Sequence, residues 1–135
     1  YDDETRLFEE LYEAYPNNVS FKFGLAVSYE KVGEIFSSLD KSDDSLHAYQ
    51  QSAQLMIELS DLYSNNVQFK DGVASSNLKL GEFYKNHRSD VEAARNYFKQ
   101  AEALWVELTA SAPDFAEFKR YVTQVRNDLH ELSQS

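Results

Sequence analysis

The sequence predicts an all-α protein built from repeated helical hairpins. Its phrase NNVSFKFG, which begins at Asn17, returns 48 residues later as NNVQFKDG at Asn65, and the same shift pairs all four glycines. Apolar residues recur at helical spacing, and no segment alternates apolar and polar residues for long enough to form a strand. Self-similarity at a fixed period of this size is typical of repeat architectures.

We expect six helices, near residues 2–15, 18–38, 43–63, 66–86, 90–111 and 115–132. The first carries Leu7, Phe8 and Leu11 and ends at Pro16. In the second and third helices the apolar side chains form helical stripes, which are Phe21, Leu25, Val32, Ile35, Phe36 and Leu39, followed by Leu46, Tyr49, Ala53, Met56, Leu59 and Tyr63. The intervening residues 40–44 are polar and rich in the types that cap helices.

The fourth, fifth and sixth helices follow the same scheme. The fourth starts at the second copy of the doubled phrase. Before the fifth, Ser89-Asp90-Val91-Glu92 has the pattern of a capping box with Ser89 as the N-cap. The sixth follows Pro113-Asp114 and is a weaker third copy of the phrase, since Phe118 stands 49 residues after Phe69. We therefore read the chain as one domain with four parts: residues 1–16, 17–64, 65–112 and 113–135.

The parts differ in completeness. Residues 17–64 and 65–112 are full repeats, and residues 113–135 form a C-terminal capping helix. Residues 1–16 match only the second half of a repeat. We therefore expect the chain to begin within a repeat and to be a fragment of a longer protein.

The composition limits the classes of partner. The net charge of −10 disfavours phosphate backbones and anionic lipids, so we expect neither a nucleic-acid nor a membrane partner. The absence of cysteine excludes disulfides and thiolate metal sites. No apolar run approaches the roughly 20 residues of a membrane span, and we expect a cytoplasmic protein.

The paired residues resemble the tetratricopeptide repeat, whose two helices carry W-x2-L-G-x2-Y and then A-x3-F. The first repeat offers Tyr29, Val32, Gly33, Phe36, Ser45, Tyr49 and Ser52 at these positions, and the second offers Asn77, Leu80, Gly81, Tyr84, Ala94, Phe98 and Ala101. A helix-interior glycine costs about 1 kcal/mol relative to alanine, which is tolerable where it lets the second helix approach closely.

The resemblance implies a short right-handed superhelix of stacked hairpins. The period of about 48 residues exceeds the usual 34, so the chain resembles the long-helix variety of these repeats. That variety is often a segment of a larger bacterial protein. The third copy lacks the signature glycine and has His130 in its place.

No group of residues in the sequence predicts catalysis. His47, His87 and His130 lie in separate segments without a second ligand at metal-binding spacing, and a solvated surface explains His47 better than a metal does. The many carboxylates are typical of solvated helical faces. We expect no enzyme activity, no metal and no cofactor. For Trp105 the sequence leaves two positions open, one in the core and one at the surface.

The resemblance also implies a binding face, because ligand contacts in this family come from the first helix of each repeat, around the signature glycine. The matching residues here are Val27, Glu30, Glu34 and Ser37 in one repeat and Ser75, Leu78, Glu82 and Lys85 in the other. A known subclass binds the C-terminal carboxylate of chaperone tails through lysine and asparagine, at positions occupied here by Glu30, Glu34, Leu78 and Glu82. These residues would repel a carboxylate, so we expect a basic or mixed-polarity peptide instead. The alternative interpretation, that the glutamates only keep an exposed helix soluble, is equally open.

Two functions remain open. The first is a non-enzymatic protein-interaction module or scaffold that presents a concave helical groove to a peptide or partner helix. The alternative is a structural spacer, or a segment that self-associates through exposed helix ends within a larger multidomain protein, for example in bacterial signalling.

Overall fold

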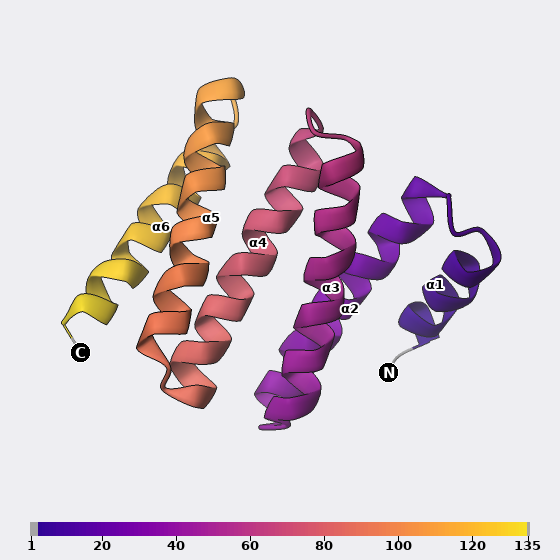
Figure 1. The fold of residues 1–135 in the computed structure, drawn as a ribbon, viewed down its shortest axis with the longest axis horizontal. Coiled ribbons are helices and arrows are strands. Elements are labelled where there is room, and N and C mark those ends of the chain that lie inside the picture. The colour runs from indigo at the N-terminus through magenta and orange to yellow at the C-terminus, as the bar shows by residue number, and fades with distance from the viewer. Residues whose placement is uncertain (1–2, 135) are drawn as a thin grey trace. The chain divides into compact units, whose positions relative to one another are not determined.

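The computed structural model describes residues 3–134, and these residues form helices joined by short turns, with no strand among them (Figure 1). The elements are α1 (Asp3–Ala14), α2 (Val19–Ser38), α3 (Ser42–Leu62), α4 (Val67–Phe83), the π-helical turn η1 (Tyr84–Arg88), α5 (Val91–Ser111) and α6 (Ala116–Ser133). The predicted all-α class and the six helices are confirmed, each α-helix beginning and ending within three residues of its predicted bounds.

The chain divides into two compact units. Unit 1 is Tyr1–Ser64, in which α2 packs against α1 and α3. Unit 2 is Asn65–Ser135, in which α5 packs against α4 and α6. The division falls between the two copies of the repeat. A right-handed superhelical stacking of the hairpins stays a prediction.

The doubled phrase begins the first helix of each hairpin. The side-chain oxygen of Asn18 accepts a hydrogen bond from the backbone N–H of Phe21 at 3.0 Å, and Asn66 accepts from Phe69 at 2.9 Å. Each asparagine thus satisfies one of the N–H groups that have no partner within the helix. Four residues further on, Lys22 pairs with Glu58 at 2.8 Å and Lys70 pairs with Glu107 at 2.7 Å. The repeated phrase therefore both starts the first helix and joins it to the second.

The extra residue of the second repeat is absorbed in the turn between its helices. In unit 1 the N–H of Lys41 donates to the carbonyl of Phe36, and in unit 2 the N–H of Asp90 donates to the carbonyl of Tyr84. The hydrogen bond of unit 2 therefore encloses one more residue than that of unit 1. The wider loop is the π-helical turn η1. Asp40 and Ser89 hold matching left-handed conformations, with φ of 57° and 51°.

The predicted capping box is wrong in its first residue. Asp90, not Ser89, is the N-cap of α5, and its carboxylate accepts a hydrogen bond from the N–H of Ala93 at 3.0 Å. Ser89 is left-handed because it ends η1, so it lies outside the capping geometry. The aspartate takes over the role because it directly precedes Val91, the first helical residue, and its φ of −97° is not left-handed.

The signature glycines occupy the same environment in both units. A Cβ atom built on Gly33 would lie 2.6 Å from Cδ1 of Tyr49, and one built on Gly81 would lie 2.6 Å from Cδ1 of Phe98. Each glycine therefore lets an aromatic ring of the second helix rest on the backbone of the first. This is the close approach that the sequence predicts.

Small residues complete the contact between the paired helices. In unit 1, Ser45 donates its hydroxyl hydrogen to the carbonyl of Gly33 at 2.8 Å, and Ser52 donates to that of Ala26 at 2.7 Å. In unit 2 the matching positions are Ala94 and Ala101, both fully buried. Unit 1 thus uses hydroxyl-to-carbonyl hydrogen bonds where unit 2 uses methyl groups.

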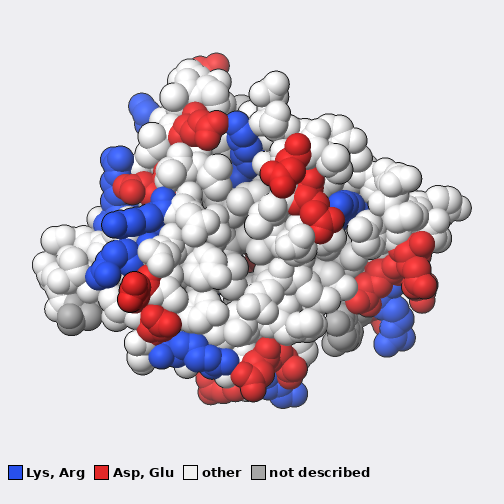
Figure 2. All heavy atoms as spheres, viewed as in Figure 1, with Lys and Arg blue, Asp and Glu red and all other residues white. Residues whose placement is uncertain are grey.

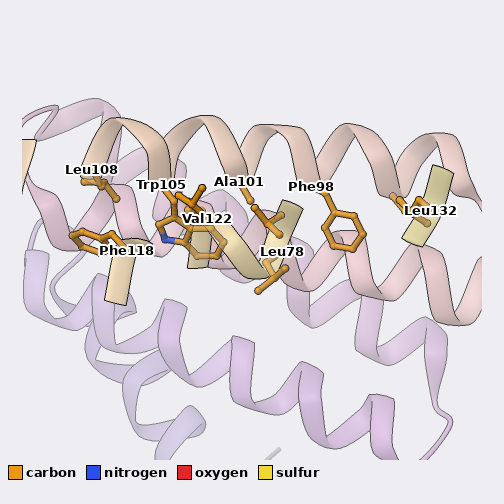
Figure 3. Close-up of a cluster of buried hydrophobic side chains, with 11 residues drawn as sticks. Leu78, Phe98, Ala101, Trp105, Leu108, Phe118, Val122 and Leu132 are labelled. Atoms are coloured by element: carbon orange, nitrogen blue, oxygen red, sulfur yellow. The ribbon is translucent and has the colours of Figure 1, made fainter. Parts of the chain in front are cut away.

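The core of unit 2 is continuous from α4 through α5 to α6 (Figure 3). Trp105, whose position the sequence leaves open, is a core residue with 2% of its surface exposed. Its indole N–H donates to Oδ1 of Asp71 at 2.9 Å. The buried side chains of this cluster are Ala74, Leu78, Ala94, Phe98, Ala101, Trp105, Leu108, Phe118, Val122, Val125 and Leu132.

Candidate functional site

Unit 1 contains a groove of about 500 Å³ that we call the first groove. It lies among all three helices of the unit and is open to solvent on one side. Its lining residues are Glu9 and Tyr12 from α1, Leu25 and Tyr29 from α2, and His47, Gln50, Gln51, Gln54 and Leu55 from α3.

The floor and the rim of the first groove differ in polarity. Leu25, Tyr29 and Leu55 are buried and give the groove an apolar floor. The rim on α3 carries the polar side chains His47, Gln50, Gln51 and Gln54. An apolar floor with a few polar groups at the edge is the usual composition of a ligand or peptide site.

One hydrogen bond fixes the acidic wall of the first groove. The hydroxyl of Tyr29 donates to Oε2 of Glu9 at 2.7 Å, which ties α1 to α2 across a separation of twenty residues in sequence. Among the described lining residues, Glu9 is the one carboxylate, and none is a lysine or arginine. The groove therefore offers a negative charge, side-chain amides and apolar contact.

The predicted binding residues of α2 do not line this groove. At about 100° per residue, Val27 and Glu34 lie on the side of α2 opposite Leu25, which is in the groove floor. Glu34 is exposed, and Val27, Glu30 and Ser37 are half-buried. The structure therefore places these four residues together on one face of α2, separate from the hollow of the unit.

The predicted binding residues of α4 and η1 have mixed positions. Leu78 has 8% of its surface exposed and belongs to the core of unit 2, so a partner would reach little of it. Lys85 forms an ion pair with Glu131 of α6 at 3.1 Å, and Glu82 approaches Lys79 at 4.0 Å. Ser75 is half-buried.

No pattern in the sequence predicted the first groove. Its amide-bearing residues follow a stretch of α3 that reads as an ordinary polar helix face, and the groove arises only where three helices meet. The available signal was the cluster Gln50, Gln51 and Gln54 beside the buried Leu55, an uncharged polar patch within a highly charged chain.

Unit 2 carries further hollows among its described residues. What we call the second groove, of about 500 Å³, lies between the first halves of α4 and α6 and is lined by Val67, Gln68, Asp71, Phe115, Glu117, Phe118 and Tyr121. Another, of about 410 Å³, lies between α5 and α6 and is lined by Val106, Thr109, Ala110, Lys119, Val122, Thr123 and Arg126. In the latter, Arg126 is held by Glu102 at 2.7 Å.

Figure 2 shows charges of both signs on each unit, with several Lys and Arg side chains gathered on the α5–α6 side of unit 2. In the described range 3–134, no group of three or more His, Asp or Glu side chains converges as a metal would require. Within the same range, no helix has both the length and the apolar content to cross a membrane. His47 is exposed on α3, as the sequence suggests.

Comparison of the chain with known protein families and with curated proteins finds no match. The resemblance to the tetratricopeptide repeat therefore rests on the residues and on the paired contacts described above.

Proposed function

We propose that this chain is a non-enzymatic protein-interaction module of tetratricopeptide-like hairpins, and that the first groove holds a peptide or partner helix. The observation that carries the proposal is the pairing of an apolar floor with an amide-rich rim in that groove. Apolar floors supply most of the binding free energy of such sites, and the polar rim orients the ligand.

The charge of the groove favours a basic or mixed-polarity peptide. Glu9 is the charged side chain at its wall, and the chain as a whole carries a net charge of −10. Such a field attracts cationic segments and repels a free carboxylate. A C-terminal carboxylate tail is therefore a poor ligand, and a segment with lysine or arginine beside apolar residues is a good one.

The α2 face formed by Val27, Glu30, Glu34 and Ser37 is the other surface proposed for partner contact. It rests on the family resemblance, and its glutamates carry the same sign of charge as Glu9. A single experiment separates the two surfaces, because they lie on opposite sides of α2.

The test is selection of short peptides from a displayed random library on the folded chain, followed by titration of variants. Gln50 is exposed on the rim, so Gln50→Trp blocks the first groove without touching the core. We expect this variant to weaken the selected peptides at least tenfold. The matched control is Asn96→Trp, at an exposed position of α5 outside every groove described here, and it should bind normally.

Two other results are informative. If Glu34→Lys abolishes binding and Gln50→Trp does not, the α2 face is the binding surface and the first groove is not. If no selected peptide binds the folded chain above background, the interaction function itself is contradicted.

Self-association is the second candidate, and exposed apolar residues favour it. At one end of unit 1, Tyr15 closes α1 while Leu62 and Tyr63 close α3, with exposed fractions of 60%, 70% and 46%. Exposed apolar residues grouped in this way often mark contact surfaces. Sedimentation at rising concentration tests the idea: a dimer that Leu62→Lys dissociates supports it, and a monomer throughout rejects it.

A further inference from the structure

The second groove combines aromatic rings with carboxylates in a way that neither the sequence nor the proposed function accounts for. Phe115, Phe118 and Tyr121 follow one another at three-residue steps along one side of α6, and Asp71 and Glu117 are the charged side chains of the lining. Among the described residues that line the groove, none is a lysine, arginine or histidine. Both charged side chains of the lining are therefore negative.

The rings are positioned by the core beneath them. Phe118 is buried and lies 5.7 Å, centroid to centroid, from Phe115, while Tyr121 lies 4.9 Å from Trp105. Phe115 itself has 54% of its surface exposed, so its ring is accessible to a ligand. An aromatic surface of this kind attracts a cation through the quadrupole of the rings.

The two carboxylates retain capacity for a ligand. Oδ1 of Asp71 accepts the indole N–H of Trp105 at 2.9 Å. Within residues 3–134, Oδ2 of Asp71 and the carboxylate of Glu117 form no hydrogen bond or ion pair. The neighbouring Lys70 is already paired with Glu107 at 2.7 Å, so it does not neutralise Asp71.

The N-terminus of α6 opposes this field only weakly. Phe115 is the N-cap of α6, and the start of a helix carries about half a positive charge. The two full carboxylate charges of Asp71 and Glu117 outweigh it. The local preference is therefore for a cation.

From this arrangement we infer that the second groove is a site for a basic peptide segment, with a lysine or arginine side chain set against Phe115 and Tyr121 and its charge between Asp71 and Glu117. Arginine suits the site best, because its planar guanidinium both stacks on rings and bonds carboxylates. The inference rests on the proposed interaction function and adds the class of partner that unit 2 recognises.

The protein contains its own reporter for this site. Trp105 is the single tryptophan of the chain, and its indole is bonded to Asp71. A cation that engages Asp71 changes the field at the indole and shifts its fluorescence. Backbone amide resonances of Asp71 and Glu117 provide a second, independent readout by NMR.

The probe is a short acetylated and amidated Gly-Ser peptide that carries arginine, compared with the same peptide carrying citrulline, the neutral isostere. We expect the arginine peptide to shift the Trp105 emission and both amide resonances, and the citrulline peptide to do neither. Asp71→Asn removes the charge but keeps an oxygen that can accept the Trp105 hydrogen bond. Glu117→Gln removes the charge on α6. Each should weaken binding about three- to tenfold.

The aromatic contribution has its own variant. Phe115→Ala should weaken binding about two- to fivefold, as expected for a cation–π contact at an exposed site, and it leaves the core intact because the ring is largely outside it. The matched charge control is Glu92→Gln, an exposed carboxylate near the start of α5, away from the groove, and it should change nothing.

Three results would overturn the inference: equal binding of the citrulline peptide, equal loss of affinity in Glu92→Gln, or no response of the folded chain to the arginine peptide. These outcomes are distinct from failure of the proposed function. Blocking the first groove with Gln50→Trp acts in unit 1, so it leaves this titration unchanged, and failure here leaves the peptides selected at the first groove unaffected.

Discussion

The ring of Phe98 rests on Gly81 so closely that a Cβ atom at the glycine would lie 2.6 Å from two of the ring carbons. Tyr49 and Gly33 make the same contact in unit 1. The backbone-to-ring contact is therefore the feature that the two repeats share most closely, and it explains why a glycine stands in the middle of a helix.

The first prediction concerns this contact. Gly81→Ala gains about 1 kcal/mol of helix propensity but forces a methyl group into a fully buried ring, which costs about 1–3 kcal/mol and requires Phe98 to move. We expect a net loss of about 1 kcal/mol in the free energy of unfolding, measured by urea denaturation. Gly33→Ala should cost less, because Tyr49 keeps 6% of its surface exposed whereas Phe98 has none.

Gly24→Ala is the internal control for this series. Its added Cβ would meet the ring of Phe8, a half-buried side chain on the short helix α1. That ring can turn toward solvent, so this variant should lose the least stability of the three. A stabilised Gly81→Ala protein would show that the ring contact does not determine the choice of glycine.

The second prediction concerns the pH dependence of stability. The ammonium of Lys22, hydrogen-bonded to Glu58 at 2.8 Å, and then the amide of Gln54 hold the pKa of Glu58 below its ordinary value of 4.5. The folded state therefore binds a proton less readily than the unfolded chain. The stabilisation is complete above the ordinary pKa and is lost as the pH falls through the lowered one.

Glu58→Gln is the measurement for that prediction. The side chain of Glu58 is 39% exposed, so solvent screens the pair and the loss at neutral pH should be modest, about 0.5 kcal/mol. The difference between wild type and variant should shrink toward zero below the lowered pKa. A difference that is constant with pH would mean that the ion pair does not contribute through its charge.

The third prediction concerns the hydroxyl groups buried between α2 and α3. Ser52 donates to the carbonyl of Ala26, and the matching residue of unit 2 is Ala101. Ser52→Ala removes the hydroxyl donor and its hydrogen bond, and the carbonyl of Ala26 keeps its hydrogen bond within α2. No buried polar group is therefore left without a partner, and the free energy of unfolding should change by less than about 1 kcal/mol. Thermal denaturation checks this, and a loss above about 2 kcal/mol would contradict it.

The sequence was sufficient for the contacts that recur at matching positions of both repeats. The pairing of Gly33 with Gly81 predicted a close approach of the second helix, and the repeated Asn18 and Asn66 predicted the helix starts. These signals are local or recur at the repeat period, so a single chain contains them. The turn around Ser89 was predicted less well, because one inserted residue fits several loop geometries.

The grooves could not be predicted in the same way. The first groove requires Glu9, Tyr29 and Gln50 to come together from three helices, and no spacing in the chain encodes that meeting. Trp105 shows the same limit, because its partner Asp71 lies 34 residues away on another helix. The family resemblance predicted a binding face on the first helix of each repeat. One residue of that predicted face, Leu78, is a core residue of unit 2.

The fourth prediction concerns Asp128 of α6. One of its oxygens, Oδ2, is buried without a hydrogen-bond partner, and burial raises the pKa of this carboxyl above its ordinary value of 3.8, against the opposing effect of Lys85. The folded state therefore favours the protonated form, and the charge opposes folding at neutral pH. The sign is the reverse of that at Glu58, because stability rises as the pH falls through the raised pKa.

Asp128→Asn should therefore raise the free energy of unfolding at pH 7, by about 0.5–1 kcal/mol, since it removes a poorly solvated charge and keeps the size of the side chain. The gain should disappear in acid, where the wild-type carboxyl is protonated. The matched control is Asn127→Asp, which adds a carboxylate at the adjacent exposed position and should have little effect. Urea denaturation at pH 7 and near pH 3 measures both, and a destabilised Asp128→Asn protein at pH 7 would show that the carboxylate is bonded within unit 2.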